Sequence, residues 1–380
     1  MEVPCVRVER ERGEETRRRL ADAGLLADEF EIEVEEGWLY VPVADPEAVP
    51  EDLRVVEREV PERDTQDTPA DLLGFEPSYE RLGDIAILDE DDPERAREIA
   101  DAVMASDLPV RTVIDRASKV KGELRVRDWE VLAGDASSGT ETVHREYGCE
   151  FALDVAEVYF SPRLATERHR VAEQVCEGRR PSENASGARR ERSEGLGEAN
   201  GEAVSGQGPR APCERAFDMF AGVGPFAIPF AKRGAEVVGV DLNERAVEYL
   251  RENARRNGVE DRVTAIQGDV RDVVAGSSRA ERSDGVRDVV EDYRDWADRI
   301  VMNLPHSADE FLDAAVALAG DDCVLHYYDI QHEGDPFGPG EAAIRAAAEP
   351  EYEVAVETRH PVRSYAPHEL NVCLDVRLTR

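Results

Sequence analysis

One stretch, residues 216–241, constrains the fold of this chain more than any other. An apolar strand runs into a turn that contains Gly222 and Gly224, a short helix follows, and a second apolar strand ends on Asp241. Because glycine has no side chain, a ligand can lie against the backbone at this turn, and the amides of the following helix point at it. The carboxylate of Asp241 is placed to accept both hydroxyls of a ribose. The stretch therefore predicts a nucleotide-type ligand site.

The rest of the C-terminal half continues the same alternation of strands and helices. Strands are expected at 215–220, 236–241, 262–266, 299–302 and 322–328, and helices at 225–233, 244–256, 308–319 and 340–348. This alternation requires a parallel, doubly wound α/β sheet. Two final strands, near 351–359 and 370–378, form a hairpin that indicates the Rossmann-like class I methyltransferase variant of that sheet.

A chain of 380 residues is too long for one average domain, and its patterns divide it into three. Residues 1–68 form a small N-terminal α/β unit with a linker, residues 69–160 an α+β domain, and residues 161–380 the nucleotide fold. Two polar insertions, 177–211 and 275–295, interrupt the last domain. The first contains almost no apolar residues, so we expect it to be disordered.

The formal charge of −37 would by itself argue against a nucleic-acid partner, because a polyanion is repelled at long range. However, the acidic residues are spread through every segment, and the chain has three lysines against 44 arginines. This pattern resembles the protein surfaces of salt-in halophiles, where molar salt shrinks the Debye length to about 3 Å. The charge therefore reflects a solvent of high salt concentration rather than the kind of partner. Local groups of arginines are the places to look for RNA contacts.

The cysteines and the N-terminus indicate a reduced, soluble protein. The six cysteines include no Cys-x-x-Cys pair, so neither a metal site nor a disulfide framework is expected, and all six should be reduced thiols. The N-terminus is too charged for a signal peptide, and no apolar run approaches the length of a membrane span. We therefore expect a cytoplasmic protein without membrane contact, acting as a monomer.

Two cofactors compete for the glycine turn. A dinucleotide requires the pattern Gly-x-Gly-x-x-Gly, but Pro225 and Phe226 follow Gly224 and the third glycine is missing. S-adenosylmethionine needs no phosphate site, so it fits the turn better. The residues after the second and third strands would then bind its ribose and adenine. These are Asp241 at the ribose, Leu242 and Asn243 at the border of the adenine, and Asp269 at the adenine edge.

The tripeptide Asn303-Leu304-Pro305 follows the fourth strand. Enzymes that methylate a base nitrogen carry a catalytic short motif at this place, where an asparagine amide and a neighbouring carbonyl can hold a planar base edge against the methyl group. The alternative is a turn that merely ends the strand.

Four segments together resemble the archaeal and eukaryotic tRNA (guanine(37)-N1)-methyltransferase family. They are residues 158–168, residues 217–226, the Asn-Leu-Pro tripeptide and residues 362–367. The resemblance covers nearly the whole chain, including the N-terminal unit, which in that family contacts the tRNA elbow. It implies transfer of a methyl group from S-adenosylmethionine to N1 of guanine 37, with tRNA as the partner and the target base flipped out of its stack.

The resemblance also implies roles for individual residues. N1 of guanine carries a proton, and Glu167 matches the general base that removes it. Arg127 best matches the catalytic arginine that stabilises charge on O6, and Arg145 is the alternative. Tyr159 would stack on or hydrogen-bond the flipped base, and Asn303 would orient it. Without the resemblance, Glu167 could be a capping or surface glutamate. Either arginine could be a phosphate contact, and Tyr159 could be a core residue.

Further residues would line the site. Phe220 and Pro305 would form walls of the cofactor pocket, while Arg163 and Arg168 would contact RNA or the methionine carboxylate, with a surface salt bridge as the alternative for either.

Other functions stay open. A related aminocarboxypropyl transferase of wyosine synthesis uses the same cofactor, and another relative methylates the wyosine precursor. A third alternative is a non-catalytic RNA-binding protein with a relic cofactor fold.

The halophile interpretation predicts that the folded state depends on salt. The free energy of unfolding, measured by urea titration, should rise between about 0.1 M and about 3 M KCl, because salt screens the repulsion among surface carboxylates. Equal unfolding free energies at the two salt concentrations would contradict this interpretation of the charge.

Overall fold

The computed structural model describes residues 2–63, 67–118, 122, 126–134, 139–176, 212–276 and 293–380. The expected insertion at 177–211 and most of the one at 275–295 lie outside these residues. The chain divides into two compact units, the first comprising Met1–Glu76 with Ala105–Leu108 and the second comprising Pro77–Met104 with Pro109–Arg380. No helix in the described part of the chain is both long enough and apolar enough to span a bilayer.

The first unit is a four-stranded antiparallel sheet in the order β2-β3-β1-β4. Its strands are β1 (Glu2–Glu9), β2 (Glu33–Glu35), β3 (Trp38–Pro42) and β4 (Arg54–Glu59). Helix α1 (Gly13–Asp22) buries Thr16 and Leu20, and Leu20 shares a core with Val6 and Val41. Helix α2 (Pro69–Leu73), which begins with a capping box between Thr68 and Asp71, also belongs to this unit. The unit therefore extends past the expected boundary at residue 68.

The second unit begins with a sheet in the order β5-β6-β7-β8. Its strands are β5 (Glu80–Leu82), β6 (Ile85–Leu88), β7 (Thr112–Arg116) and β8 (Trp129–Gly134). Only β6 and β7 are parallel, and the crossover between them carries helix α3 (Pro93–Ala105). This is the α+β domain that the sequence predicts.

The hairpin of β9 (Glu141–Glu146) and β10 (Cys149–Asp154) is a separate two-stranded sheet. Asn253 on helix α6 (Glu244–Arg256) accepts a hydrogen bond from the amide of Ala152 at 2.7 Å and donates to its carbonyl at 3.1 Å. Asn257 makes the same pair of contacts with Glu150. The hairpin is thus bonded to the nucleotide fold, although the sequence analysis placed it in the preceding domain.

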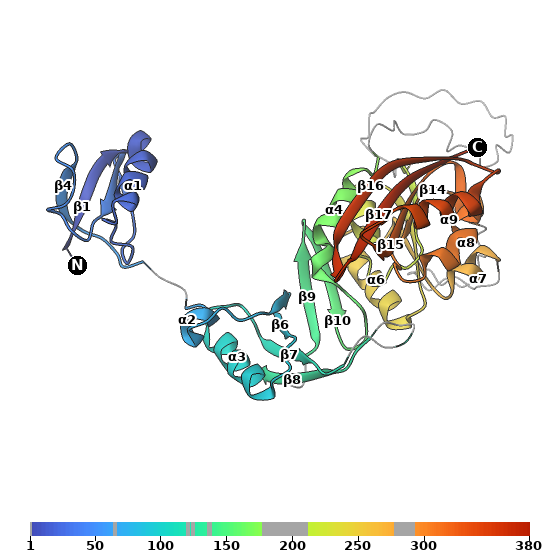
Figure 1. Ribbon diagram of the computed structural model, residues 1–380, viewed down its shortest axis with the longest axis horizontal. Helices are drawn as coiled ribbons and strands as arrows, with labels where there is room; N and C mark the ends of the chain where they lie inside the picture. Colours follow the sequence, from blue (N-terminus) through green and yellow to red (C-terminus); the bar gives the residue numbers. More distant parts are fainter. Residues whose placement is uncertain are drawn as a thin grey trace, which may run out of the picture. The chain divides into compact units, whose positions relative to one another are not determined.

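The nucleotide fold is a seven-stranded sheet in the order β13-β12-β11-β14-β15-β17-β16. Figure 1 labels its strands β14, β15, β16 and β17. The strands are β11 (Arg215–Asp218), β12 (Glu236–Asp241), β13 (Val263–Gln267), β14 (Ala297–Met302), β15 (Ala319–His332), β16 (Glu353–Ala366) and β17 (Glu369–Thr379). Strands β11 to β15 are parallel, and β17 runs antiparallel to both of its neighbours. This order confirms the predicted class I methyltransferase sheet with its final hairpin.

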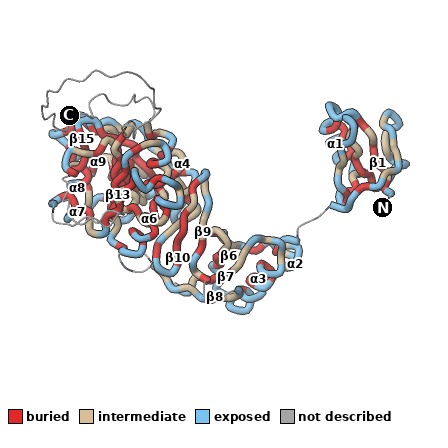
Figure 2. Tube along the Cα trace, turned by 180° about the vertical axis from the view of Figure 1, so that it is seen from behind, coloured by how far each residue is buried: buried red, intermediate tan, exposed pale blue. Residues whose placement is uncertain are grey.

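Both faces of this sheet are covered, because its central strands are apolar on both sides. Phe217 and Val238 pack on one face against residues of α7 (Val270–Val274), α8 (Leu312–Leu318) and α9 (Gly338–Ala348). Ala216 and Val237 pack on the other against α4 (Ala165–Glu173), α5 (Ala227–Lys232) and α6. Figure 1 shows the two helical layers, and Figure 2 shows the buried strands between them.

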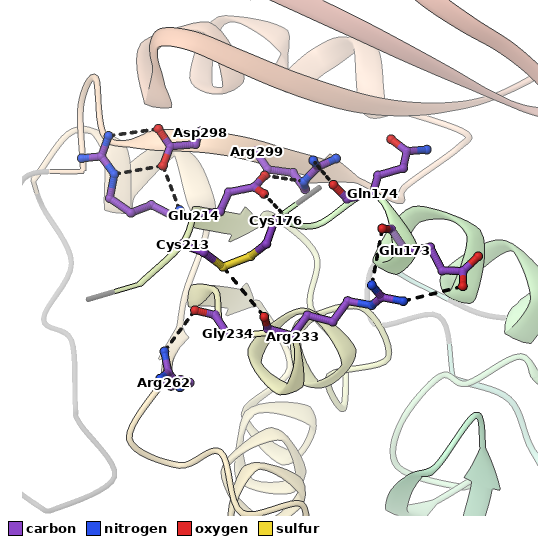
Figure 3. The surroundings of a disulfide bond; sticks show 11 residues. Glu173, Gln174, Cys176, Cys213, Glu214, Arg233, Gly234, Arg262, Asp298 and Arg299 are labelled. Atoms are coloured by element: carbon purple, nitrogen blue, oxygen red, sulfur yellow. Dashed lines mark hydrogen bonds and ion pairs between the residues drawn. A yellow bond between two sulfur atoms is a disulfide. The ribbon is translucent and has the colours of Figure 1, made fainter. Parts of the chain in front are cut away.

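The expectation of six reduced cysteines is wrong in one place, because Cys176 and Cys213 form a disulfide (Figure 3). Their Cα atoms lie 5.7 Å apart, on the two sides of the sequence range 177–211. The amide of Cys176 also donates to Glu214 at 2.8 Å, which joins the end of α4 to the start of β11. Contacts across the fold bring the two cysteines together, and their spacing in the sequence carries no sign of it. Cys5, Cys149, Cys323 and Cys373 are buried and form no disulfide.

Candidate active site

The glycine turn between β11 and α5 has the backbone that the sequence predicts. Gly222 and Gly224 both have positive φ, at 53° and 96°. A Cβ atom on Gly224 would lie 2.6 Å from Leu250 and 2.9 Å from Ile228, whereas one on Gly222 would meet nothing within 4 Å. Gly224 is therefore required for packing, and Gly222 borders open space where a ligand can approach the backbone.

Asp241, at the end of β12, is held by the turn itself. Its carboxylate accepts hydrogen bonds from the amide of Gly222 at 2.7 Å and from the amide of Asn243 at 2.8 Å. Burial raises the pKa of this carboxyl, and the two amides oppose that rise. Each oxygen keeps a further lone pair, so the oriented carboxylate can still accept two ribose hydroxyls.

Most of the predicted site residues line one cavity of about 470 Å³, which we call the glycine-turn cavity. Its volume is that of a small-molecule site. The predicted residues in its wall are Tyr159, Arg168, Phe220, Gly222, Asp241, Leu242, Asn243, Asp269 and Asn303. Its lining does not contain Gly224, Pro305, Arg127 or Glu167, in the part of the chain that the structure describes.

Several of these wall residues also have structural partners. Asn243 caps helix α6, and its side chain donates to the carbonyl of Glu157 at 2.8 Å. Asp269 caps α7 and pairs with Arg271, which lies 4.6 Å from the ring of Phe311. Asn243 and Asp269 therefore help to shape the wall whether or not they also touch a ligand.

Arg168 is almost fully buried at the side of this cavity. Its guanidinium binds both oxygens of Glu146, at 2.7 and 2.6 Å, and lies 4.9 Å from the ring centre of Phe160. The salt bridge considered as an alternative for Arg168 is thus present, though it is buried rather than at the surface.

A second cavity of about 940 Å³, which we call the adjoining cavity, shares Tyr159, Phe160 and Asn303 with the first. Among the predicted residues it also contains Arg127, Arg163 and Pro305. Pro305 was expected at the cofactor, and the structure places it here instead, although its neighbours Leu304 and His306 line the glycine-turn cavity. The two cavities meet at the side chains that the sequence assigns to the target base.

The structure separates the two candidate catalytic arginines. Arg127 lines the adjoining cavity, 5.4 Å from the ring centre of Trp129, and burial and the neighbouring Arg116 lower the pKa of its guanidinium. A guanidinium in such a place gains from a nearby anion. Arg145 is exposed, pairs with Glu150 at 2.9 Å and lines a different groove. The geometry therefore favours Arg127 over Arg145.

Arg163 lies at the edge of the adjoining cavity. It forms an ion pair with Glu80, which also binds Arg116 at 2.7 Å. The salt bridge considered for Arg163 is therefore also present.

Glu167 lies apart from both cavities. It is only 4% exposed, and its carboxylate accepts two hydrogen bonds from Arg170 and one from the hydroxyl of Tyr328, all at 2.8 Å. His360 is 3.3 Å away. The structure thus places the predicted base in a buried polar cluster, not beside Asp241 and Asn303. Helical geometry explains this, because Glu167 and its neighbour Arg168 point to different sides of α4.

The cluster around Glu167 continues across the sheet. Arg170 also binds Asp375 at 2.6 Å, and His326 lies between Asp375, at 2.6 Å, and Arg299, at 2.5 Å. His326, Cys373 and Asp375 are close enough to hold a metal ion, with candidate ligand atoms within 4.8 Å of one another. Because Arg170 and Arg299 already neutralise this group, we interpret it as a buried ion network.

Asp218, at the end of β11, is a polar residue that the sequence analysis missed. It is 1% exposed, and its Oδ2 atom has no hydrogen-bond partner. Burial, with a further contribution from the charge of Asp241, raises its pKa to about 7. Asp218 ends the apolar strand that precedes the glycine turn, just as Asp241 ends the next strand, so a carboxylate at a strand end was the signal that could have found it. Phe311, edge-to-face with Phe220 at 4.9 Å, is a second missed wall residue.

Three family models match the chain. They describe a tRNA methyltransferase 5 N-terminal domain at residues 5–51, a TYW2 N-terminal domain at 58–137, and a TRM5/TYW2 methyltransferase domain at 142–182 and 209–355. The tRNA (guanine(37)-N(1))-methyltransferase Trm5b of Pyrococcus abyssi is 36% identical over 385 residues, covering 99% of both chains. The chain belongs to the Trm5/TYW2 family.

Other members of the Trm5/TYW2 family are similar over different lengths. Trm5b of Methanocaldococcus jannaschii is 30% identical over 99% of both chains, and an aminocarboxypropyltransferase of Pyrococcus horikoshii is 30% identical over 83% of this chain. The crystal structure of Pyrococcus abyssi Trm5b covers all of this chain with a TM-score of 0.63. A complex of aTrm5 with tRNALeu covers 99% of it with a TM-score of 0.64 and 28% identity. Family membership confirms the prediction of an S-adenosylmethionine-dependent methyltransferase.

The raised pKa of Asp218 predicts that replacing it with Asn stabilises the protein more as the pH rises. The folded state holds a proton on Asp218 up to about pH 7, whereas the unfolded chain releases it near pH 4. The contribution of this bound proton to the free energy of unfolding is fully present below pH 4 and is lost as the pH rises through 7. The advantage of Asp218→Asn in unfolding free energy should therefore grow by about 2–3 kcal/mol between pH 5 and pH 8.

The measurement is urea unfolding of the variant and the parent protein at both pH values. The exposed aspartate Asp272 gives a matched control, Asp272→Asn. An advantage of Asp218→Asn that does not change with pH would contradict the assigned protonation.

Proposed function

We propose that this protein transfers the methyl group of S-adenosylmethionine to N1 of guanine 37 in tRNA. The observation that carries the proposal is the similarity to two Trm5b enzymes over 99% of both chains, including the N-terminal unit. The aminocarboxypropyltransferase is similar over only 83% of this chain. The pair of cavities that meet at Tyr159 and Asn303 supports the same conclusion, because a methyl transfer needs one site for each reactant.

The glycine-turn cavity fits the cofactor. Asp241 would bind the ribose hydroxyls, and the open space at Gly222 lets the ligand lie against the backbone. Leu242, Asn243 and Asp269 would border the adenine, with Phe220 on the opposite wall. When bound, S-adenosylmethionine supplies an electrophilic methyl group on its sulfonium.

The adjoining cavity, at about 940 Å³, is large enough for a guanine that has left its stack. Tyr159 and Asn303, in the shared wall, would hold the edge of this base toward the cofactor. Because the methyl group must approach N1 in line, this positioning contributes directly to the rate.

Two further groups would manage the charge of the reaction. As N1 gains the methyl group, its proton must leave, and the negative charge that would develop on O6 needs a cation. Arg127 is the cation that the geometry favours. Glu167 is the base that the family resemblance implies, and it would have to exchange its bonds with Arg170 and Tyr328 for one to the substrate. Leu164, one helical turn before Glu167, lines both cavities, which supports a short path for that movement.

The proposed reaction predicts where a labelled methyl group goes. Unmodified tRNA incubated at high salt with cofactor labelled in the methyl group should gain one label at N1 of guanine 37. Product mapping by mass spectrometry separates the alternatives. An unlabelled aminocarboxypropyl product would support the aminocarboxypropyl transferase of wyosine synthesis. Label on a wyosine precursor would support the relative that methylates this precursor. If no product forms, the result would support a non-catalytic RNA-binding protein.

The proposed roles predict that Glu167→Gln and Arg127→Gln lower kcat by about a hundredfold or more, without weakening cofactor binding. Arg145→Gln is the matched control, because it removes the same charge from an exposed site in another groove, and it should leave kcat nearly unchanged. Rates come from the labelled-methyl assay and cofactor affinity from calorimetry. A parallel loss of cofactor affinity in Glu167→Gln would contradict its role as the base.

A further inference from the structure

Two residues of the C-terminal hairpin enter the adjoining cavity beside the proposed base site. Arg363 on β16 and Asn371 on β17 are directly opposite each other in the strand register, and both line this cavity. The hydroxyl of Tyr365 and the ring of His306 are hydrogen-bonded at 3.0 Å. This bond joins the hairpin to the loop that carries Asn303.

Each of the two side chains has a buried polar atom without a partner. These atoms are the Nε donor of Arg363 and the Oδ1 acceptor of Asn371, whose residue is only 4% exposed. Most buried polar atoms in folded proteins are hydrogen-bonded, because an unpaired one carries a desolvation cost. A donor and an acceptor left open side by side in a cavity wall indicate a ligand that supplies both partners.

The chemistry of the pair defines that ligand. Arg363 has no carboxylate partner among the described residues, so its guanidinium can bind an anion such as a phosphate. The Oδ1 of Asn371 needs a donor close to that anion. An RNA backbone offers this combination, because a phosphate oxygen accepts and the neighbouring ribose 2′-hydroxyl donates.

We propose that Arg363 and Asn371 bind the ribose and phosphate of a nucleotide at or next to the flipped base. Arg363 contacts the phosphate, and Asn371 accepts a hydrogen bond from the 2′-hydroxyl. This wall of the cavity would then position the tRNA strand and distinguish RNA from DNA, independently of the base. The inference rests on the proposed function, since it assumes that a tRNA nucleotide enters this cavity.

The 2′-hydroxyl contact is tested with tRNAs that carry a single 2′-deoxy nucleotide at position 36, 37 or 38. For the parent protein, one of these substitutions should lower kcat/KM about tenfold, the value of one hydrogen bond. Asn371→Leu should lower kcat/KM about tenfold on the all-ribose tRNA and show no further loss with that deoxy nucleotide. Asn371→Asp keeps the acceptor and should stay sensitive to it.

The phosphate contact is tested by salt dependence. For Arg363→Gln, the slope of log Kd for tRNA against log salt should become shallower by about 0.7, which corresponds to one phosphate contact on a single strand. Arg359→Gln is the matched control on the same strand, because Arg359 pairs with Glu341 away from the cavity, and its slope should equal that of the parent protein.

The inference is overturned if each deoxy substitution has the same effect in the parent protein and in Asn371→Leu, or if none affects the parent protein. An unchanged salt slope in Arg363→Gln overturns the phosphate contact. Unchanged cofactor affinity in each variant serves as the check on folding. If the parent protein does not methylate tRNA, the proposed function fails, and the Kd values of the same deoxy tRNAs then test the two contacts separately.

Discussion

The hydrogen bond from the amide of Gly222 to the carboxylate of Asp241, at 2.7 Å, joins the two strand ends on which the proposed cofactor site depends. It exists because both glycines of the turn adopt positive φ and because Gly224 allows Leu250 and Ile228 to pack closely behind it. A side chain at Gly224 would separate the turn from helix α6. Both Gly222 and Asp241 lie in the wall of the glycine-turn cavity, which shares Asn303 with the adjoining cavity.

Buried charge is the second constraint on this strongly acidic chain. With many more carboxylates than basic groups, most arginines near the site have a carboxylate partner, as Arg168 has Glu146 and Arg163 has Glu80. The same pairing holds Glu167 against Arg170. Such an arrangement leaves Arg127 and Arg363 as the cations best placed for an incoming anion at the adjoining cavity. A chain with a net charge of −37 can therefore still present a local site for RNA.

Much of the nucleotide fold was predictable, because its elements follow strong local rules. The strand 236–241 and the helix 244–256 lie where the apolar period and the capping Asn243 predict them. Strand β1 was missed, since charged residues alternate with its buried valines in a small unit. The bonds between the hairpin β9–β10 and the nucleotide fold were not predictable, because Asn253 and Asn257 are about a hundred residues away from the hairpin in the sequence.

The sequence by itself determined the family, the sheet and the residues around the glycine turn, because each can be recognised from short motifs and from the apolar period of single elements. Only the tertiary structure placed Arg127 at the adjoining cavity and Arg145 at a different groove. It also moved Pro305 to the adjoining cavity, placed Glu167 in a buried ion network and joined Cys176 to Cys213. It also placed Arg363 and Asn371 at the cavity. These outcomes depend on which distant segments meet and on how buried charges find partners, and a linear pattern does not contain that information.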